Sequence, residues 1–270
     1  MSTSRPGRIP EASEEGFRRA CRVTANASPE IGPTPIGGLR EVSIDIKIGS
    51  ARPEPPDLPL PSEPSPARLL LVRHGQSTWN REHRIQGQLD PPLSELGRRQ
   101  ARQVGRRLAH HRFAGFYTSD LERAEQTAQL IGEATGSSPF PRAGLREIYL
   151  GDWEGLNTEE LAQRFPEAWA RWMEEPSWDV VPGGEGAVPF ESRVNAELDW
   201  ILARHEHGDV LVVTHGGVIQ VALHRVVGRP NHGLFPFRIE NASISVIEKR
   251  NGRFVVSGVN DTSHLEAGSE

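Results

Sequence analysis

Cysteine is nearly absent from this chain, because Cys21 is the only one in 270 residues. One thiol cannot form an intramolecular disulfide bond, and it cannot build a cysteine-based metal site. Three motifs of other enzyme classes are also missing: the G-x-x-x-x-G-K-[ST] phosphate loop, the G-x-S-x-G serine elbow and the H-E-x-x-H zinc motif. The sequence therefore indicates no nucleotide-binding loop, no serine hydrolase and no metal centre.

A basic excess and long apolar runs are lacking as well. The net charge is -5, which does not favour a nucleic-acid binder, although a local cluster of arginines would suffice for a small anion. The longest aliphatic runs have the length of a strand, far below the roughly 20 residues that a membrane span needs. No apolar region follows Arg18 and Arg19, so we expect no secretory or twin-arginine signal. We predict a cytoplasmic protein that binds neither nucleic acid nor membranes.

Proline is concentrated near the start of the chain. Twelve of the 22 prolines lie within residues 1–67, so we predict that residues 1–66 form a proline-rich, disordered extension. Within it, residues 41–48 alternate apolar and polar side chains, and this segment could dock on a sheet edge, bind a partner or have no role. A start codon assigned too early is another explanation of the region. Residues 67–264 are predicted to fold as one domain, and residues 265–270 to form a disordered tail.

Apolar strands alternate with amphipathic helices from Ala67 onward. The pattern predicts strands at residues 68–73, 115–118, 209–214, 242–248 and 254–259, and helices at about 95–110, 121–135 and 217–227. One more helix is predicted from the capping pair Asn157 and Glu160 through Trp169, and another from Phe190 to residue 201. Ser119 and residue 120 are expected to cap the helix that begins at residue 121. The alternation predicts an α/β sheet covered by helices on both faces.

Two of the apolar strands end in the same dipeptide. LLLVRHG spans residues 69–75 and VLVVTHG spans residues 210–216. Ligands of open α/β sheets bind at the carboxyl ends of strands, so His74 and His215 are expected to face one crevice. The glycines that follow, Gly75 and Gly216, let the backbone approach a ligand closely. One such pair alone would more often be structural, but two equivalent pairs, one preceded by Arg73, favour a site.

An arginine lies where a helix is expected to begin, in TSDLERAEQTA at residues 118–128. Arg123 in a first helical turn opposes the helix dipole, which favours negative charge there. The arrangement is favourable if an anion is held at that helix start by Arg123 and the free backbone amides. A solvated surface arginine is the alternative when the segment is considered alone.

A carboxylate lies among apolar residues in LREIYLGDWEG, residues 145–155. Its neighbours would desolvate Glu147 and raise its pKa toward that of a general acid. The alternative is that Glu147 is a structural ion-pair partner of Arg146 or Arg142.

Two histidines, two arginines and one carboxylate together suit phosphoryl transfer. Arginines bind phosphate oxygens in bidentate fashion, and a neutral imidazole can attack phosphorus to give a phosphohistidine. A carboxylic acid can protonate the leaving alkoxide and then, as a carboxylate, activate water. This chemistry needs no metal ion and no cofactor.

Four blocks of the chain resemble, in the same order, the motif series of the histidine phosphatase superfamily in its phosphoglycerate-mutase-like branch: RHGQSTWN, SDLERAEQTA, LREIYLGDWEG and VTHGG. The resemblance covers residues 67–264. It implies a three-layer α/β/α sandwich with a mostly parallel central sheet and a catalytic pocket at the carboxyl edge of that sheet.

The resemblance also implies roles for individual residues. His74 would be the phosphorylated nucleophile and Glu147 the proton donor, while Arg73, Arg123 and His215 complete the catalytic set. The residues implied to bind the substrate or to lie near it are Arg73, Asn80, Gln86, Gly87, Arg123 and Gly216.

The spacing of the motifs bears on the type of enzyme. Glu147 and His215 are 68 positions apart, which resembles the compact phosphatases of the superfamily, whereas its bisphosphoglycerate-using mutases carry a longer insertion there. A mutase must shield its phosphohistidine from water, so we favour a metal-independent phosphomonoesterase acting on a small phosphorylated metabolite. A phosphoglycerate mutase and a non-catalytic phospholigand-binding protein are the alternatives. Gly186 and Ala187 differ from the hydroxyl-bearing residues that are commoner at these positions of the superfamily, which leaves the substrate contacts of this stretch open. The oligomeric state is also open, with a dimer as one option.

Overall fold

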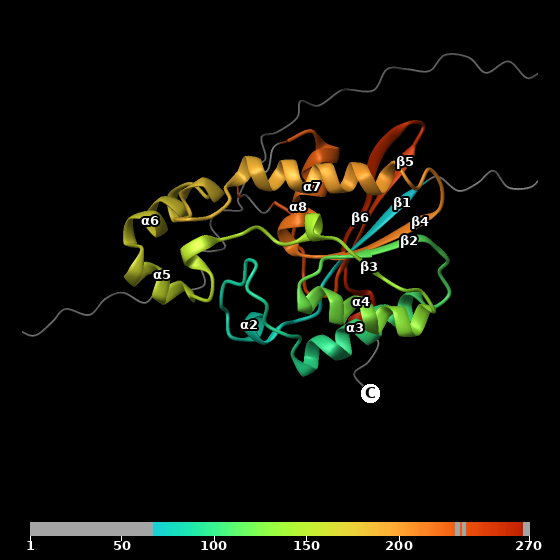
Figure 1. The fold of residues 1–270 in the computed structure, drawn as a ribbon, viewed down its shortest axis with the longest axis horizontal. Helices are drawn as coiled ribbons and strands as arrows, with labels where there is room; N and C mark the ends of the chain where they lie inside the picture. The colour runs from blue at the N-terminus through green and yellow to red at the C-terminus, as the bar shows by residue number, and fades with distance from the viewer. Residues whose placement is uncertain (1–66, 230–232, 234–235, 267–270) are drawn as a thin grey trace, which may run out of the picture. The chain divides into compact units, whose positions relative to one another are not determined.

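A six-stranded sheet forms the centre of the fold, in the order β3-β2-β4-β1-β5-β6 (Figure 1). The fold is that of a computed structural model, which describes residues 67–229, 233 and 236–266. The strands are β1 (Arg68–Arg73), β2 (Phe113–Thr118), β3 (Phe140–Pro141), β4 (Asp209–Thr214), β5 (Ile244–Arg250) and β6 (Arg253–Asp261). β1 to β4 pair in parallel, whereas β5 is antiparallel to both β1 and β6. The predicted mostly parallel sheet is thus confirmed, and the predicted extension over residues 1–66 lies outside the described residues.

Helices cover both faces of this sheet, which confirms the three-layer prediction. In Figure 1, α7 and α8 lie on one face and α3 and α4 on the other. The helices are α2 (Thr78–Arg81), α3 (Glu95–Leu108), α4 (Glu122–Thr135), α5 (Thr158–Arg164), α6 (Pro166–Glu174), α7 (Ala187–Leu202), α8 (Gly216–Val227) and α9 (Ser263–Glu266). Three short 3-10 turns are η1 (Ala143–Leu145), η2 (Gly151–Trp153) and η3 (Trp178–Val180).

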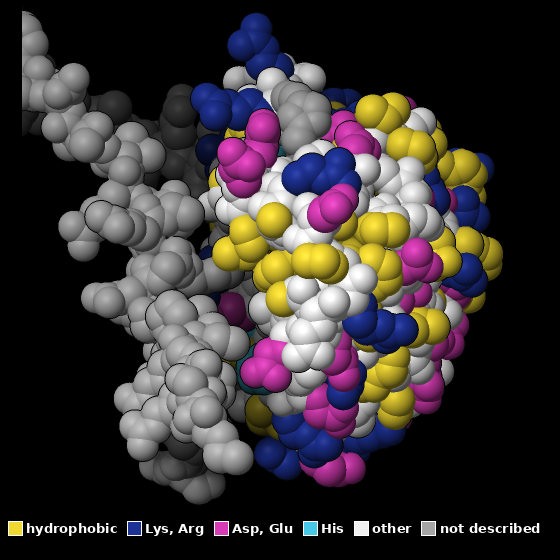
Figure 2. Space-filling model, turned by 90° about the vertical axis from the view of Figure 1, so that its left-hand side faces the viewer, with side chains coloured by type: hydrophobic (Ala, Val, Ile, Leu, Met, Phe, Trp, Pro, Cys, Tyr) yellow, Lys and Arg dark blue, Asp and Glu magenta, His cyan; other side chains and the backbone are white. Residues whose placement is uncertain are grey.

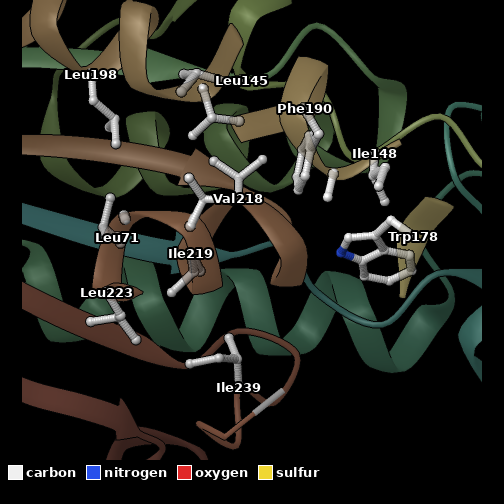
Figure 3. Close-up of a cluster of buried hydrophobic side chains, with 14 of the residues drawn as sticks. Leu71, Leu145, Ile148, Trp178, Phe190, Leu198, Val218, Ile219, Leu223 and Ile239 are labelled. Carbon is white, nitrogen blue, oxygen red and sulfur yellow. The ribbon is translucent and has the colours of Figure 1, made fainter. Parts of the chain in front are cut away.

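The central strands are buried on both sides because their side chains alternate between two cores. In β1, Leu69 and Leu71 belong to the core under α7 and α8, whereas Leu70 and Val72 belong to the core under α3 and α4. Figure 3 shows the first core continuing from the sheet to Trp178 beyond it. The carboxyl ends of the strands are therefore held by rigid packing on two faces.

One predicted helix is two helices in the structure. α5 begins at the predicted capping pair, Asn157 with Glu160, but ends at Arg164, and α6 begins at Pro166. The proline has no N–H to continue the helix, and its ring disfavours the helical conformation of the preceding residue. Phe165 accordingly has φ -131° and ψ 54°.

The end of the domain lies slightly beyond the predicted boundary at residue 264. α9 spans Ser263–Glu266, and Leu265 packs on the core under α3 and α4. Residues 265 and 266 therefore belong to the folded domain, and the rest of the predicted tail lies outside the described residues. In the described part of the chain, no helix has the length and apolar character that crossing a membrane requires.

Candidate active site

The pairing of β1 with β4 brings the two His-Gly dipeptides together. Arg73 lies opposite Thr214, and the N–H of His74 donates to the carbonyl of Thr214 at 2.9 Å. The rings of His74 and His215 lie 5.1 Å apart between their centroids, with 60° between their planes. Both side chains are buried. The structure thus places the two histidines side by side at the ends of neighbouring strands, as the repeated dipeptide predicts.

His74 is held in one tautomer by its own loop. Its Nδ1 lies 2.7 Å from the carbonyl oxygen of Gly75. A carbonyl can only accept, so Nδ1 carries the proton and Nε2 keeps a free lone pair. Burial, followed by the charges of Arg123 and Arg73, lowers the pKa of His74 well below its usual 6.5. A neutral imidazole with an exposed lone pair on Nε2 is the form that can attack phosphorus.

Gly75 lies against the start of α3. A Cβ built on Gly75 would lie 2.4 Å from the carbonyl oxygen of Gly97, the third residue of α3. The absence of a side chain at Gly75 therefore lets the start of α3 approach the loop that carries His74. Its N–H donates to Oγ1 of Thr127 on α4 at 3.0 Å. Two helices thus fix the loop that carries His74.

Arg123 is a buried arginine at the start of α4, with only 1% of its surface exposed. Its guanidinium donates to the carbonyls of Leu89 at 2.8 Å and Gly87 at 2.7 Å. Burial lowers the pKa of Arg123 to about 10, although the negative charge of Glu147 partly offsets this effect by raising the pKa. The side chain therefore stays protonated at neutral pH. This excludes the solvated arginine considered from the sequence. Gly87 orients Arg123 through its carbonyl.

Three buried polar atoms of the predicted site have no hydrogen-bond partner among the described residues: Nε of Arg73, Nε of Arg123 and Nδ1 of His215. Unpaired buried polar atoms are costly and uncommon in folded proteins, and functional sites are one place where they occur. Arg73 is further held by a 2.7 Å bond from Nη1 to the carbonyl of Ile239. Two cations and an imidazole nitrogen with spare bonding capacity fit an anionic group.

Glu147 lies against the start of α8. Its Oε2 accepts the N–H of Gly217 at 3.1 Å, and its Oε1 accepts the N–H of Ile148 at 3.0 Å. A Cβ on Gly217 would lie 2.3 Å from Oε1, so only glycine leaves this space for the carboxylate. The charge of Glu147 raises the pKa of both Arg73 and Arg123, against the lowering effect of burial. Gly217 is not among the predicted site residues, although its position directly after the second His-Gly dipeptide was a usable signal.

The structural alternative for Glu147 is not supported. Arg146 pairs with Asp120 and Arg142 with Glu197, each at 2.6 Å. The backbone carbonyl of Glu147 instead accepts from Arg193 at 3.2 Å.

Residues 183–193, which include the first turns of α7, hold the backbone on either side of Glu147. Arg193 pairs with Glu185 at 2.6 Å and donates to the carbonyls of Gly144 and Arg146. Oε1 of Glu185 also accepts the N–H of Tyr149 at 2.8 Å. This stretch thereby fixes the backbone around Glu147 without a hydroxyl at Gly186 or Ala187.

Asn80 has its amide orientation fixed by its neighbours. Its Oδ1 accepts from the N–H of Ser77 at 3.1 Å and from Nδ2 of Asn241 at 3.2 Å. The Nδ2 group of Asn80 makes no hydrogen bond with the described residues, so a donor is left over for a ligand. Gln86 lies next to this group, because its Oε1 accepts from Oγ of Ser77 at 2.7 Å.

Asn241 is a residue that the sequence analysis missed. Its Nδ2 also donates to the carbonyl of His74 at 3.1 Å. The antiparallel strand β5 begins beside the end of β1, with Ile244 opposite Val72. A polar residue just before an antiparallel strand was therefore the signal that could have identified it.

The remaining predicted residue, Gly216, begins α8 directly after His215. A Cβ there would lie 3.7 Å from Nε of Arg73, which is an ordinary contact distance. Gly216 therefore lies against the unpaired Nε of Arg73.

A cleft of about 280 Å³ lies elsewhere, at the beginning of β1. It is lined by apolar residues such as Leu69 and Phe254, with Arg225 and Arg253 beside them, and by no histidine or carboxylate. The residues suited to chemistry lie at the opposite end of the strand. Among the residues that the structure describes, no group of three or more His, Cys, Asp or Glu side chains is placed to hold a metal ion.

Side chains of both charge signs are interspersed on the face that Figure 2 displays, which is the side at which α5 and α6 lie. A uniform basic surface is therefore not a feature of this face. The cations available to an anion at the predicted site are instead the buried Arg123 and the half-buried Arg73.

Comparison with known proteins agrees with this geometry. A sequence model of the histidine phosphatase superfamily (branch 1) matches residues 69–262. The chain belongs to this superfamily. A histidine phosphatase relative, phosphoserine phosphatase 1 of Hydrogenobacter thermophilus, is 35% identical over 73% of this chain and 94% of its own length.

Two further relatives show the range of the superfamily around this chain. A probable phosphoglycerate mutase, GpmB of Klebsiella pneumoniae, is 35% identical over 74% of this chain and 95% of its own length. The solved structure of Bacillus stearothermophilus YhfR is 34% identical, covers 74% of this chain and 99% of its own, and superposes with a TM-score of 0.68. Relatives named as phosphatases and as mutases both occur, so the family alone does not separate the two activities.

Proposed function

We propose that this histidine phosphatase is a metal-independent phosphomonoesterase that hydrolyses a small phosphorylated metabolite through a phosphorylated His74. The observation that carries the proposal is the buried, neutral His74, whose Nδ1–H donates to the Gly75 carbonyl, beside the buried Arg123 and the half-buried Arg73. Covalent catalysis of this kind divides one difficult displacement into two easier ones.

In the first step, Nε2 of His74 attacks phosphorus and the bond from phosphorus to the ester oxygen breaks. Arg73 and Arg123 hold the phosphoryl oxygens and balance their charge, as cationic groups do in other phosphoryl transfers. Asn80 adds a neutral donor. Glu147, in its protonated form, gives its proton to the departing alkoxide.

In the second step, Glu147 accepts a proton from a water molecule, whose oxygen attacks phosphorus. The bond from phosphorus to Nε2 breaks, which releases inorganic phosphate and restores the neutral imidazole. The position of the carboxylate against the start of α8 serves both steps, because the same group must reach the leaving oxygen and then the water.

Hydrolysis is favoured over mutase activity by the short segment between Glu147 and His215, which leaves little chain to cover the phosphohistidine. The relatives named as phosphoserine phosphatases support the same choice. The relative named as a probable phosphoglycerate mutase supports the second candidate, which uses the same first step.

The test is to incubate the protein with p-nitrophenyl phosphate and trap an acid-labile phosphoenzyme that is absent in His74→Ala. Turnover by His74→Ala at the wild-type rate would refute the proposal. Incubation with 3-phosphoglycerate and a bisphosphate primer separates the two activities, because a phosphatase releases inorganic phosphate and a mutase forms the 2-isomer.

A further inference from the structure

Ser119 is a buried serine that the proposed chemistry does not yet use. It lies between β2 and α4, and none of its surface is exposed. The sequence predicted that it caps α4, but the cap position is Leu121, which makes no side-chain cap bond. The Oγ of Ser119 lies instead 2.8 Å from Nε2 of His215. Ser119 therefore contacts His215 and does not occupy the cap position of α4.

The proton on this contact can be placed by accounting for donors and acceptors. His215 is fully buried, and burial, followed by the charges of Arg123 and His74, lowers its pKa well below the usual value, so the ring carries one proton. The Oγ of Ser119 already accepts the N–H of Leu121 at 3.3 Å. Among the described residues its hydroxyl proton has no acceptor other than Nε2. Donation from Ser119 to Nε2 therefore satisfies the hydroxyl and leaves the ring proton on Nδ1.

The opposite placement gives a poorer arrangement. If Nε2 carried the ring proton, the hydroxyl of Ser119 would be a buried donor without an acceptor, and Nδ1 would present a lone pair. Nδ1 is the atom of His215 that has no partner in the structure. A lone pair there would repel the oxygens of a phosphoryl group held by Arg73 and Arg123, whereas an N–H would bind them.

We propose that Ser119 is a positioning residue that fixes His215 in the tautomer with the proton on Nδ1, so that His215 donates to a phosphoryl oxygen. The catalytic part of this proposal rests on the proposed function, because only a bound phosphoryl group gives the Nδ1 proton an acceptor. The tautomer itself is a property of the free protein. It can therefore be measured whether or not the protein hydrolyses any ester.

The experiment begins with the wild-type protein. Long-range proton–nitrogen correlation spectra of the uniformly labelled protein distinguish the two neutral tautomers of each histidine, and His215→Asn identifies the signals of His215. We expect the Nδ1–H pattern in the wild type and a shift toward the Nε2–H form in Ser119→Ala. A wild-type His215 in the Nε2–H form would overturn the proposal without requiring any variant of Ser119 to fold.

Activity provides the second readout. Ser119→Ala should lower kcat/KM for p-nitrophenyl phosphate about 10- to 100-fold, the range typical of a residue that orients a contacting group, and it should weaken inhibition by orthovanadate. Ser119→Thr, which keeps a hydroxyl, should restore most of the loss. The matched control is Ser245→Ala, which removes another fully buried hydroxyl, one that accepts the N–H of Asn260 at 3.1 Å.

The outcomes separate the two proposals. Equal kcat/KM in Ser119→Ala and Ser245→Ala, with an unchanged tautomer, would refute the role of Ser119. Full activity of His74→Ala would refute the phosphohistidine mechanism and leave the tautomer measurement intact. A loss in Ser119→Ala that Ser245→Ala does not share, accompanied by the tautomer shift, supports the positioning role.

Discussion

The two His-Gly dipeptides look alike in the sequence but differ in which ring nitrogen is committed. In His74, Nδ1 is bonded to the Gly75 carbonyl and Nε2 is free. In His215, Nε2 is bonded to Ser119 and Nδ1 is free. The partner of His74 is an acceptor, which leaves a lone pair on Nε2. The partner of His215 is inferred to be a donor, which leaves a proton on Nδ1. In the proposed mechanism, this difference between their neighbours makes His74 the nucleophile and His215 a hydrogen-bond donor.

The glycines of the two dipeptides differ in the same way. Gly75 lets α3 approach at a distance where a Cβ would meet the Gly97 carbonyl, so the nucleophile's loop is held by backbone packing. Gly216 has room for a Cβ, and the next residue, Gly217, is the one that accommodates Glu147. The first dipeptide is built for rigidity, and the second lies at a helix start that receives the carboxylate.

Replacing each histidine in turn by asparagine should have the largest effects on activity and should distinguish the two histidines most clearly. His74→Asn should abolish the phosphoenzyme and lower kcat by about 10⁴-fold or more, the scale seen when a covalent nucleophile is lost. His215→Asn should still form the phosphoenzyme, but about 10²- to 10³-fold more slowly, as for loss of one stabilising donor. Rapid-quench trapping of the phosphoenzyme checks both. A phosphoenzyme in His74→Asn but not in His215→Asn would mean that the two roles are reversed.

Arg123 is shared by the two histidines, so its removal should affect both. Arg123→Ala takes away a charge that, after burial, contributes to the lowered pKa of each ring, and it removes one of the two cations available to a phosphoryl group. We expect kcat/KM to fall about 10³-fold, with weaker inhibition by inorganic phosphate, since charge stabilisation is the largest contribution to such reactions. The control is Arg225→Ala, on the far end of α8, where the arginine pairs with Asp199. An unchanged kcat/KM in Arg123→Ala would place this arginine outside the pocket.

Gly217→Ala tests the second dipeptide's connection to Glu147. The added methyl would lie 2.3 Å from Oε1 of Glu147, which can move because it is the end of a flexible side chain. We expect the protein to fold with normal thermal stability while kcat falls about 10²-fold, the cost of a displacement near 1 Å. Gly258→Ala, which has open space around its α-carbon, serves as the control. A melting temperature that falls together with kcat would indicate a packing defect in place of a misplaced carboxylate.

How far the sequence predicts this site depends on the range of the interactions involved. The apolar strand runs and the position of each His-Gly dipeptide are local signals, and they placed β1, β4 and both histidines correctly. Pro166 was also a local signal, because a proline there ends one helix and begins another. The helical spacing of Leu161, Phe165 and Trp169 nevertheless led to the prediction of a single helix.

Three residues contact the site through partners that no local pattern in the sequence identifies. Ser119 is of a residue type that is common at helix N-caps, and it lies beside His215 because β2 pairs with β4. Asn241 reaches His74 across 167 positions. Arg193 supports Glu147 from α7, through a carbonyl that any residue type could supply. Predicting such contacts requires the strand order, which follows from the packing of the whole sheet.

The smallest effect that we expect is on stability: lowering the pH should decrease the free energy of unfolding through both histidines. Both histidines have pKa values well below 6.5 in the folded protein because both are buried near the same arginines. As pH falls below 6.5, the unfolded chain binds a proton at each position and the folded chain does not, so the free energy of unfolding decreases. This contribution to stability is complete above pH 6.5 and is lost toward acid, by on the order of 1 kcal/mol per histidine for each pH unit below 6.5.

Urea unfolding of the wild type and three variants at pH 7.5, 6.5 and 5.5 measures this effect. His74→Asn and His215→Asn should each lose less stability toward acid than the wild type, by about the same amount, because asparagine takes up no proton in either state. His110→Asn, which alters an exposed side chain, should follow the wild-type curve. If His74→Asn flattened the curve and His215→Asn did not, the ring of His215 would be protonated in the folded protein. It would then offer a proton from both nitrogens, and Ser119 would have to act as the acceptor.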